Sequence, residues 1–147
     1  MERPLTIPGN NDLTAIQIIT GNIKISIFNI YNDCTHSATL TQLCQYMEEV
    51  WLNIGLGANN HILWCGDFNK HHPLWDDKAD EHLFTPQALR EAAILIGLLA
   101  DEGLEMALLK GVPTLKHMVT KLYSCKVFTH GATLLEISCG FQSVDGC

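Results

Sequence analysis

The sequence predicts an α/β layered sandwich. Candidate strands and helices follow one another in the order strand, strand, helix, strand, helix, strand, strand, which is typical of layered α/β domains. With 147 residues, 47% of them hydrophobic and 17% charged, the chain has enough apolar material for the core of a single domain. We expect one domain over residues 12–130. The ends, residues 1–11 and 131–147, show no periodic pattern and are expected to be irregular.

The first two strands are expected at residues 15–20 and 23–31, joined as an antiparallel hairpin by the turn Gly21-Asn22. Isoleucines alternate with other residues along the second strand, at positions 23, 25 and 27. Ser37 can then cap a helix over residues 38–56, because apolar residues recur there at steps of three and four. That helix is expected to end in glycine.

The remaining elements are shorter. Residues 61–65 form an apolar run that indicates a buried strand. Thr85 followed by Pro86 is typical of a helix start, and the apolar pattern continues to about residue 101. Short strands are expected over 104–108 and 114–118, and residues 126–129 are a further candidate beyond that order.

The densest polar chemistry lies directly after the strand at 61–65, in Gly-Asp-Phe-Asn at residues 66–69, with histidines at 71 and 72. Asp67 and Asn69 would project from the carboxyl end of that strand, where layered α/β folds bind ligands. A carboxylate there can hold a divalent cation or accept a proton from water, and a carboxamide can orient that water or a phosphate oxygen. The alternative is an ordinary Asx turn, since Gly, Asp and Asn are common turn residues.

Charge and composition limit the function classes. Sixteen acids against nine Lys and Arg give a net charge of -7, the wrong sign for tight nonspecific binding to nucleic acid, so contact with DNA would be local or bridged by metal. The six cysteines contain no Cys-x-x-Cys pair and no signal peptide is evident, so we expect an intracellular protein with reduced thiols. The longest apolar run, 92–100, is far below the roughly 20 residues of a membrane span.

Four segments together resemble one family: Ile-Tyr-Asn at 30–32, the strand and turn at 62–69, His-His-Pro-Leu-Trp at 71–75, and Gly-Val-Pro-Thr at 111–114. The chain resembles the endonuclease/exonuclease/phosphatase family, and within it the apurinic-type endonuclease domain of non-LTR, LINE-like retrotransposons, especially fungal ones. The resemblance runs over about residues 14–124 and matches the later part of the family's domain. It implies a DNase I-like sandwich and a magnesium-dependent phosphodiesterase that nicks DNA.

The resemblance also implies roles for individual residues. Asp67 would hold or deprotonate the attacking water, Asn69 would orient that water and contact the scissile phosphate, and Tyr31 would hydrogen-bond a phosphate oxygen. Thr114 matches a position near the DNA-facing surface. The two histidines that mark the retrotransposon subgroup, His71 and His72, are expected to border the substrate.

The chain departs from the family's pattern at both ends. The early Asn and metal-binding Glu of the family have no counterpart before Tyr31, and the late Asp and His motif is absent. We therefore expect a fragment without the first strands and the final motif strand, assign no metal ligand, and expect little or no hydrolysis. The alternative is a non-catalytic remnant that at most binds partners. An exposed sheet edge would favour self-association, and a functional retrotransposon endonuclease would act in the nucleus.

Three other features have simpler readings. Trp64 and Trp75 are expected in the core rather than as platforms for bases. A zinc site is conceivable but lacks paired spacing, so a solvated acidic loop is favoured; its members would be His61, His71, His72, His82, Asp76, Asp77 and Asp80. One local positive segment could face nucleic acid or simply be solvated; it consists of Lys110, Lys116, His117, Lys121 and Lys126.

Overall fold

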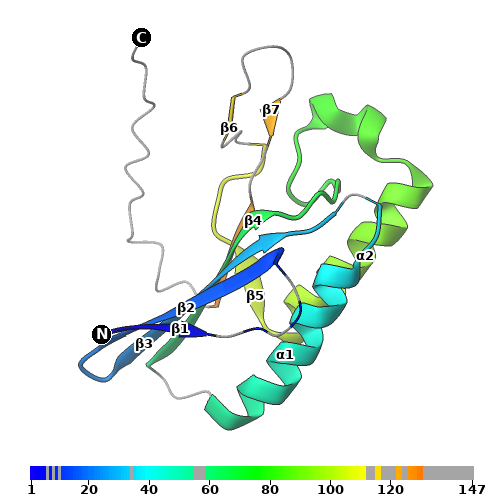
Figure 1. The fold of residues 1–147 in the computed structure, drawn as a ribbon. Helices are drawn as coiled ribbons and strands as arrows, with labels where there is room; N and C mark the ends of the chain where they lie inside the picture. The colour runs from blue at the N-terminus through cyan, green and yellow to red at the C-terminus, as the bar shows by residue number, and fades with distance from the viewer. Residues whose placement is uncertain are drawn as a thin grey trace.

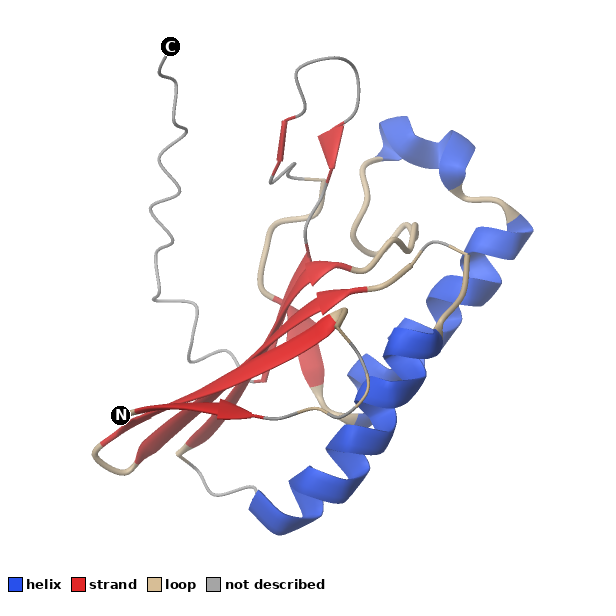
Figure 2. Ribbon diagram, in the orientation of Figure 1, coloured by secondary structure: helices blue, strands red, loops and turns tan. Residues whose placement is uncertain are grey.

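The computed structural model describes residues 1–5, 7, 9, 11–33, 35–54, 59–111, 115–116, 122–123 and 126–130. Its main body is a six-stranded sheet with two long helices on one face (Figures 1 and 2). The elements of that body are β1 (Glu2–Leu5), β2 (Leu13–Thr20), β3 (Ile23–Tyr31), α1 (Ala38–Ile54), β4 (Asn60–Asp67), the 3-10 helix η1 (Lys78–Leu83), α2 (Pro86–Asp101), β5 (Leu104–Met106) and β8 (Lys126–His130). A separate two-stranded pair consists of β6 (Leu115–Lys116) and β7 (Leu122–Tyr123).

The strand order is β1-β2-β3-β4-β8-β5. Only β3 and β4 are parallel neighbours, and α1 connects them, as a parallel pair requires a crossover. The other neighbours in this sheet are antiparallel. The predicted α/β class is therefore confirmed, and the carboxyl ends of β3 and β4 meet at one end of the sheet.

The predicted hairpin forms, but its buried face is not the isoleucine face. β2 and β3 pair through the turn at Gly21, which has a positive φ of 57° and so suits glycine. On β3 the buried residues are Ser26, Phe28 and Ile30, whereas Ile23 is 37% exposed. Alternation alone could not assign the face, because both sides of this strand carry apolar residues and the helices cover only one of them.

The core lies between the sheet and the helices. The sheet contributes Phe28, Ile30, Ile62 and Trp64, and each is at most 2% exposed. The helices contribute an apolar stripe from each, namely Leu40, Leu43 and Met47 of α1 and Ala92, Leu95 and Leu99 of α2. Trp75 is also buried, and its indole N–H donates to the Lys70 carbonyl at 2.8 Å. The prediction that both tryptophans are core residues is confirmed.

The opposite side, which we call the outer face, carries the alternate residues of the same strands. Cross-strand pairs there include Ile16 with Ile27 and Ile18 with Ile25. Ile16 is 45% exposed, and the other three are partly buried. In Figures 1 and 2 neither helix lies on this side of the sheet.

Residues 1–11 are not wholly irregular, which corrects the expectation for the amino end. Glu2–Leu5 forms β1, paired antiparallel with β2. The amino group of Met1 donates to the Ile19 carbonyl at 2.8 Å, and Leu5 packs against the core. Pro4 concealed this strand in the sequence. It is tolerated because β1 is at the edge of the sheet, where a missing N–H need not break a ladder.

The other boundaries differ less. The strand at 104–108 is shorter, Leu104–Met106, and the one at 114–118 is described only at 115–116. The 3-10 helix η1 was not predicted; Asp77 caps it by accepting from the Ala79 N–H at 2.8 Å. Residues 55–58, Thr114 and 131–147 lie outside the described residues. In the described part of the chain, no helix has both the length and the hydropathy of a membrane span.

Candidate active site

The site residues predicted from the sequence begin at the carboxyl ends of β3 and β4. Tyr31 and Asp67 are direct partners in the parallel ladder, so both side chains belong to the outer face. Tyr31 is 50% exposed and Asp67 is partly buried. The two groups that the sequence placed 36 positions apart are therefore neighbours on the open side of the sheet.

Gly66 allows β3 and β4 to lie close together. Its φ is 133°, and a Cβ at this position would lie 2.1 Å from the Ile30 carbonyl oxygen. No side chain fits there without moving the backbone of β3. The glycine of the Gly-Asp-Phe-Asn motif is thus required by packing, because it allows Asp67 to follow a strand in close contact with Ile30.

Asp67 and Asn69 are joined by a turn. The Asn69 N–H donates to Asp67 Oδ1 at 3.1 Å, and Asn69 has a φ of 48°. The Asx turn proposed as the simpler interpretation is therefore present. It is compatible with a catalytic role, because the same turn fixes Asn69 beside Asp67 at the end of β4. Asn69 is the one non-glycine residue with positive φ in the described chain, a conformation that occurs preferentially at functional sites.

Asn32 holds this turn in place, and sequence reasoning missed its role. It is fully buried; its N–H donates to the Asp67 carbonyl at 2.8 Å and its Nδ2 to the Phe68 carbonyl at 3.1 Å. Its own carbonyl accepts from Asn69 Nδ2 at 2.8 Å. The available signal was an asparagine directly after an apolar strand, since a buried carboxamide needs several partners.

Asn32 also leaves an acceptor unused. Among the described residues, its Oδ1 is a buried oxygen without a hydrogen-bond partner in the structure. Such groups are rare, because desolvation without a partner costs free energy. The side chain therefore contributes to the turn through Nδ2, which donates to the Phe68 carbonyl.

His71 and His72 are engaged within their own loop. His71 Nδ1 lies 3.2 Å from Asp76 Oδ2, and the His72 N–H donates to the same oxygen at 3.0 Å. His72 Nδ1 accepts from the Leu74 N–H at 3.1 Å, and its ring lies 5.3 Å from that of Trp75. Both histidines therefore shape the loop that follows the turn. Thr114 lies outside the described residues.

Lys70 is a buried charge behind the turn. Its Nζ lies 3.3 Å from Glu91 Oε2, while its side chain is 1% exposed. The pKa of Glu91 is lowered first by the hydrogen bond from Gln87 and then by Lys70. The pKa of Asp33 is also lowered, mainly by hydrogen bonds from Thr35, with smaller contributions that include the Lys70 charge.

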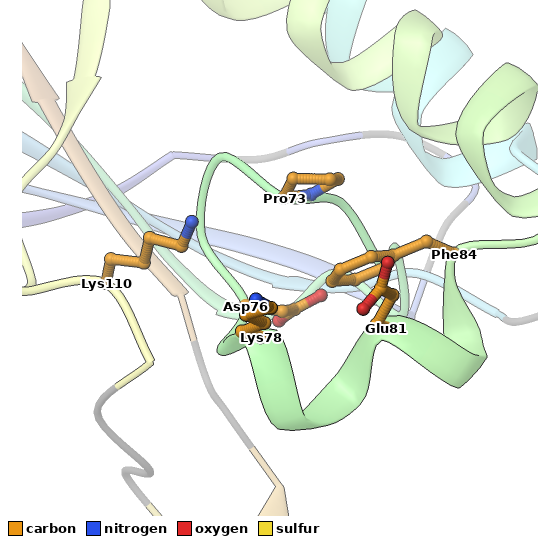
Figure 3. Close-up of a pocket in the computed structure, with 6 residues that line it drawn as sticks. All are labelled: Pro73, Asp76, Lys78, Glu81, Phe84 and Lys110. Carbon is orange, nitrogen blue, oxygen red and sulfur yellow. The ribbon is translucent and has the colours of Figure 1, made fainter.

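A pocket of about 250 Å³ lies beyond the histidine loop (Figure 3). Carboxylates and ammonium groups line it together; the residues are Pro73, Asp76, Lys78, Glu81, Phe84 and Lys110. Gly111 N–H donates to the Trp75 carbonyl at 2.9 Å, which ties the segment after β5 to this loop. Lys110 is the member of the predicted positive segment whose side chain is described, and it lines this pocket together with Asp76 and Glu81 (Figure 3).

The described residues do not form a closed metal site. No group of three or more His, Cys, Asp or Glu in that part of the chain could hold a metal ion. Asp67 is the carboxylate that the carboxyl ends of β3 and β4 place on the outer face. Mg²⁺, however, is commonly bound by one or two carboxylates together with substrate phosphates and water. Asp67 fits that limited role as a single protein ligand.

Comparisons with known proteins agree with the motifs. The model of the endonuclease-reverse transcriptase family matches residues 25–123. The endonuclease domain of TRAS1, a telomere-specific non-LTR retrotransposon, has a similar structure, with 17% identity, a TM-score of 0.65 and coverage of 92% of this chain. An endonuclease/exonuclease/phosphatase family protein from Leptotrichia buccalis C-1013-b matches with 15% identity and a TM-score of 0.41, over 81% of this chain and 42% of its own. No curated protein matches.

The family match covers most of the chain and contains Tyr31, Asp67 and Asn69. The fold match covers 57% of the TRAS1 domain, so this chain spans little more than half of that domain's length. At 17% identity that likeness concerns the fold. The chain thus has the fold of a retrotransposon endonuclease domain, and it belongs to the endonuclease-reverse transcriptase family.

Proposed function

We propose that this chain carries one half of a metal-dependent phosphodiesterase site that nicks DNA, with Asp67, Asn69 and Tyr31 acting at the scissile phosphate. The observation that carries the proposal is the ladder register, in which Tyr31 and Asp67 are partners at the carboxyl ends of parallel strands. The turn then adds Asn69, fixed through Asn32. Three polar groups of complementary chemistry thus share one accessible edge.

Each group has a distinct task. The Asp67 carboxylate accepts a proton from the attacking water or holds the cation. The Asn69 carboxamide orients the water and the phosphate, with one donor committed to the Asn32 carbonyl. The exposed hydroxyl of Tyr31 donates to a phosphate oxygen as charge develops there. These are tasks of positioning and electrostatic stabilisation, for which fixed side chains are effective.

A bound Mg²⁺ would neutralise charge on the phosphate, and Asp67 would be its protein ligand. The remaining coordination would come from water and from the DNA itself. We therefore expect weak cation binding in the absence of DNA. This expectation matches a site in which the described residues contribute a single carboxylate.

DNA is the proposed substrate, and a nick exposing a 3' hydroxyl would serve target-primed reverse transcription in the nucleus. His71, His72 and Thr114 would border the bound strand. The net charge of -7 predicts that contact with DNA is local to this edge rather than spread over the surface. Removal of one stabilising donor from a hydrolase commonly costs a hundredfold or more in rate, so a half-site is expected to be slow.

A second candidate is a non-catalytic α/β module that associates with itself. The outer face favours it, since Ile16 and Ile23 are 45% and 37% exposed on an apolar sheet surface. Such a surface is stabilised when another layer covers it. This candidate predicts a dimer or higher oligomer at micromolar concentration and no turnover.

A plasmid-nicking assay separates the two candidates. Supercoiled DNA is incubated with the chain, with Asp67→Ala and with Asp80→Ala, an acid of η1 that serves as the matched control, each with Mg²⁺ or with a chelator. The proposal predicts slow, Mg²⁺-dependent nicking that Asp67→Ala abolishes and Asp80→Ala retains. Equal nicking by all three proteins, or none by the unaltered chain after long incubation, contradicts it.

A further inference from the structure

Lys70 is a buried cation placed directly after the proposed catalytic asparagine. Among the lysines and arginines whose burial the structure describes, it is the one that is buried, with its side chain 1% exposed. Removing an ammonium group from water is unfavourable unless a partner compensates. An apolar side chain at this position would avoid that cost, so the charge calls for a specific explanation.

The contacts of Lys70 fix it at both ends. Its carbonyl accepts from the Trp75 indole N–H at 2.8 Å, and its Nζ lies 3.3 Å from Glu91 Oε2 on α2. Glu91 is itself held from the preceding turn of α2, because Gln87 Nε2 donates to Glu91 Oε1 at 2.6 Å. The loop after β4 is thereby connected to a rigid helix 21 residues further along the chain.

The residue that precedes Lys70 needs such support. Asn69 has a φ of 48°, in the left-handed region, which asparagine enters more readily than other non-glycine residues but which is still less favourable than helix or strand. From one side Asp67 and Asn32 hold it, through bonds of 3.1 and 2.8 Å. Lys70 provides the anchor on the other side, since a fixed residue 70 restricts the backbone rotations available to residue 69.

We propose that the Lys70–Glu91 pair is a positioning device that keeps Asn69 oriented toward the scissile phosphate. The inference rests on the proposed function for what Asn69 does, but the restraint itself is a property of the free protein. A pair that merely stabilises the fold has a different signature. Loss of a pair that only stabilises the fold would lower the stability of the whole domain. Loss of a positioning pair would instead increase local opening of the turn at residues 67–69 first.

Hydrogen exchange measured by NMR distinguishes these signatures. The reporters are the Asn69 and Asn32 backbone N–H groups, which donate to Asp67 Oδ1 and to the Asp67 carbonyl. The reference is the set of ladder amides between β2 and β3. Glu91→Gln removes the counter-charge with little change in shape. Glu48→Gln is the matched control, because Glu48 is an exposed carboxylate of α1 that accepts from the Cys44 thiol at 3.7 Å.

We expect Glu91→Gln to accelerate exchange at the two reporter amides about tenfold, with the reference amides unchanged. Glu48→Gln should leave both sets unchanged. The double variant Lys70→Met/Glu91→Gln removes the buried charge as well, so it should keep the unfolding midpoint while the reporters still exchange faster. The proposal is wrong if the reporters are unaffected, or if reporters and reference accelerate together.

Because this measurement uses no DNA, it is independent of the nicking assay. Accelerated reporter exchange together with an unaltered chain that never nicks DNA would support the positioning device and contradict the proposed function. Slow nicking by the unaltered chain together with unaffected reporters would do the reverse.

Discussion

The two faces of the sheet differ in what covers them and in what they carry. The helix-facing side is closed by α1 and α2, and residues such as Ile62 and Trp64 are fully buried there. The outer face is apolar and open over β2 and β3, with Ile16 at 45% exposure, and it carries Tyr31 and Asp67 at one end. The groups proposed to act on the phosphate therefore lie on the open side, while an anchor of the turn, Phe68, is buried. Neighbouring residues of one short turn thus have different roles, since Asp67 lies on the outer face and Phe68 packs in the core.

The largest effect on stability is expected at Gly66, near the carboxyl end of β4. Gly66→Ala would place a Cβ 2.1 Å from the Ile30 carbonyl oxygen at a φ of 133°. We expect a loss of about 4 kcal/mol in the free energy of unfolding, or failure to fold. Urea denaturation measures it. Gly97→Ala is the control, because nothing lies within 4 Å of its added Cβ, and in helix α2 alanine should stabilise by up to about 1 kcal/mol.

The contribution of each face to stability can be compared by replacing one isoleucine on each face with alanine. Ile62→Ala on the closed side should cost about 3 kcal/mol, since it leaves a cavity at a residue with no exposure. Ile16→Ala on the outer face should cost below about 1 kcal/mol. Equal losses in urea denaturation would mean that the outer face is covered in solution. Sedimentation over a range of concentrations would then identify self-association as the cover.

Replacing Asn32, which anchors the turn, should have an intermediate effect on stability. Asn32→Ala removes the donors to the Phe68 and Asp33 carbonyls, both at 3.1 Å, from a fully buried site. We expect a loss of about 2 kcal/mol, because buried carbonyls lose partners. Asn29→Ala, at an exposed position of β3, is the matched control and should be nearly neutral. A neutral Asn32→Ala would show that the turn is held without the Asn32 side chain.

The smallest expected effect is a loss of folding stability at acid pH. The folded-state pKa of Glu91 is below its ordinary value of 4.5, through Gln87, Lys70 and Arg90, and that of Asp33 is below 3.8, chiefly through Thr35. A lowered pKa means that the unfolded chain binds protons more readily. The stabilisation is therefore complete above the ordinary values and is lost as the pH falls through the folded ones. Glu91→Gln should flatten this acid limb in unfolding curves recorded below pH 5; an unchanged limb would assign it to Asp33 or to other acids.

Much of the fold follows from local patterns. The hairpin around Gly21, the Thr85 cap of α2 and the strand before the turn were all predicted, because spacing and turn chemistry are local. β1 was missed because its pairing with β2 is tertiary and Pro4 argued against a strand. The buried face of β3 was not determined either, since two apolar faces give no contrast.

The candidate site shows the same division between local features, which could be predicted, and tertiary contacts, which could not. Asp67 and Asn69 were found because they lie together in a motif, and Tyr31 was found through the family resemblance. Asn32 and the Lys70–Glu91 pair were not found. Their partners are 36 and 21 residues away, and only the fold brings them together.

The central claim is that the outer face at the carboxyl ends of β3 and β4 is where this chain meets DNA. An NMR titration of the labelled chain with a short DNA duplex in Mg²⁺ tests it without requiring turnover. The account predicts that the resonances of Tyr31, Asp67 and Asn69 shift first and that those of core residues such as Ile62 stay in place. Shifts confined to Lys78 and Lys110 of the pocket, with Tyr31, Asp67 and Asn69 unchanged, would contradict it.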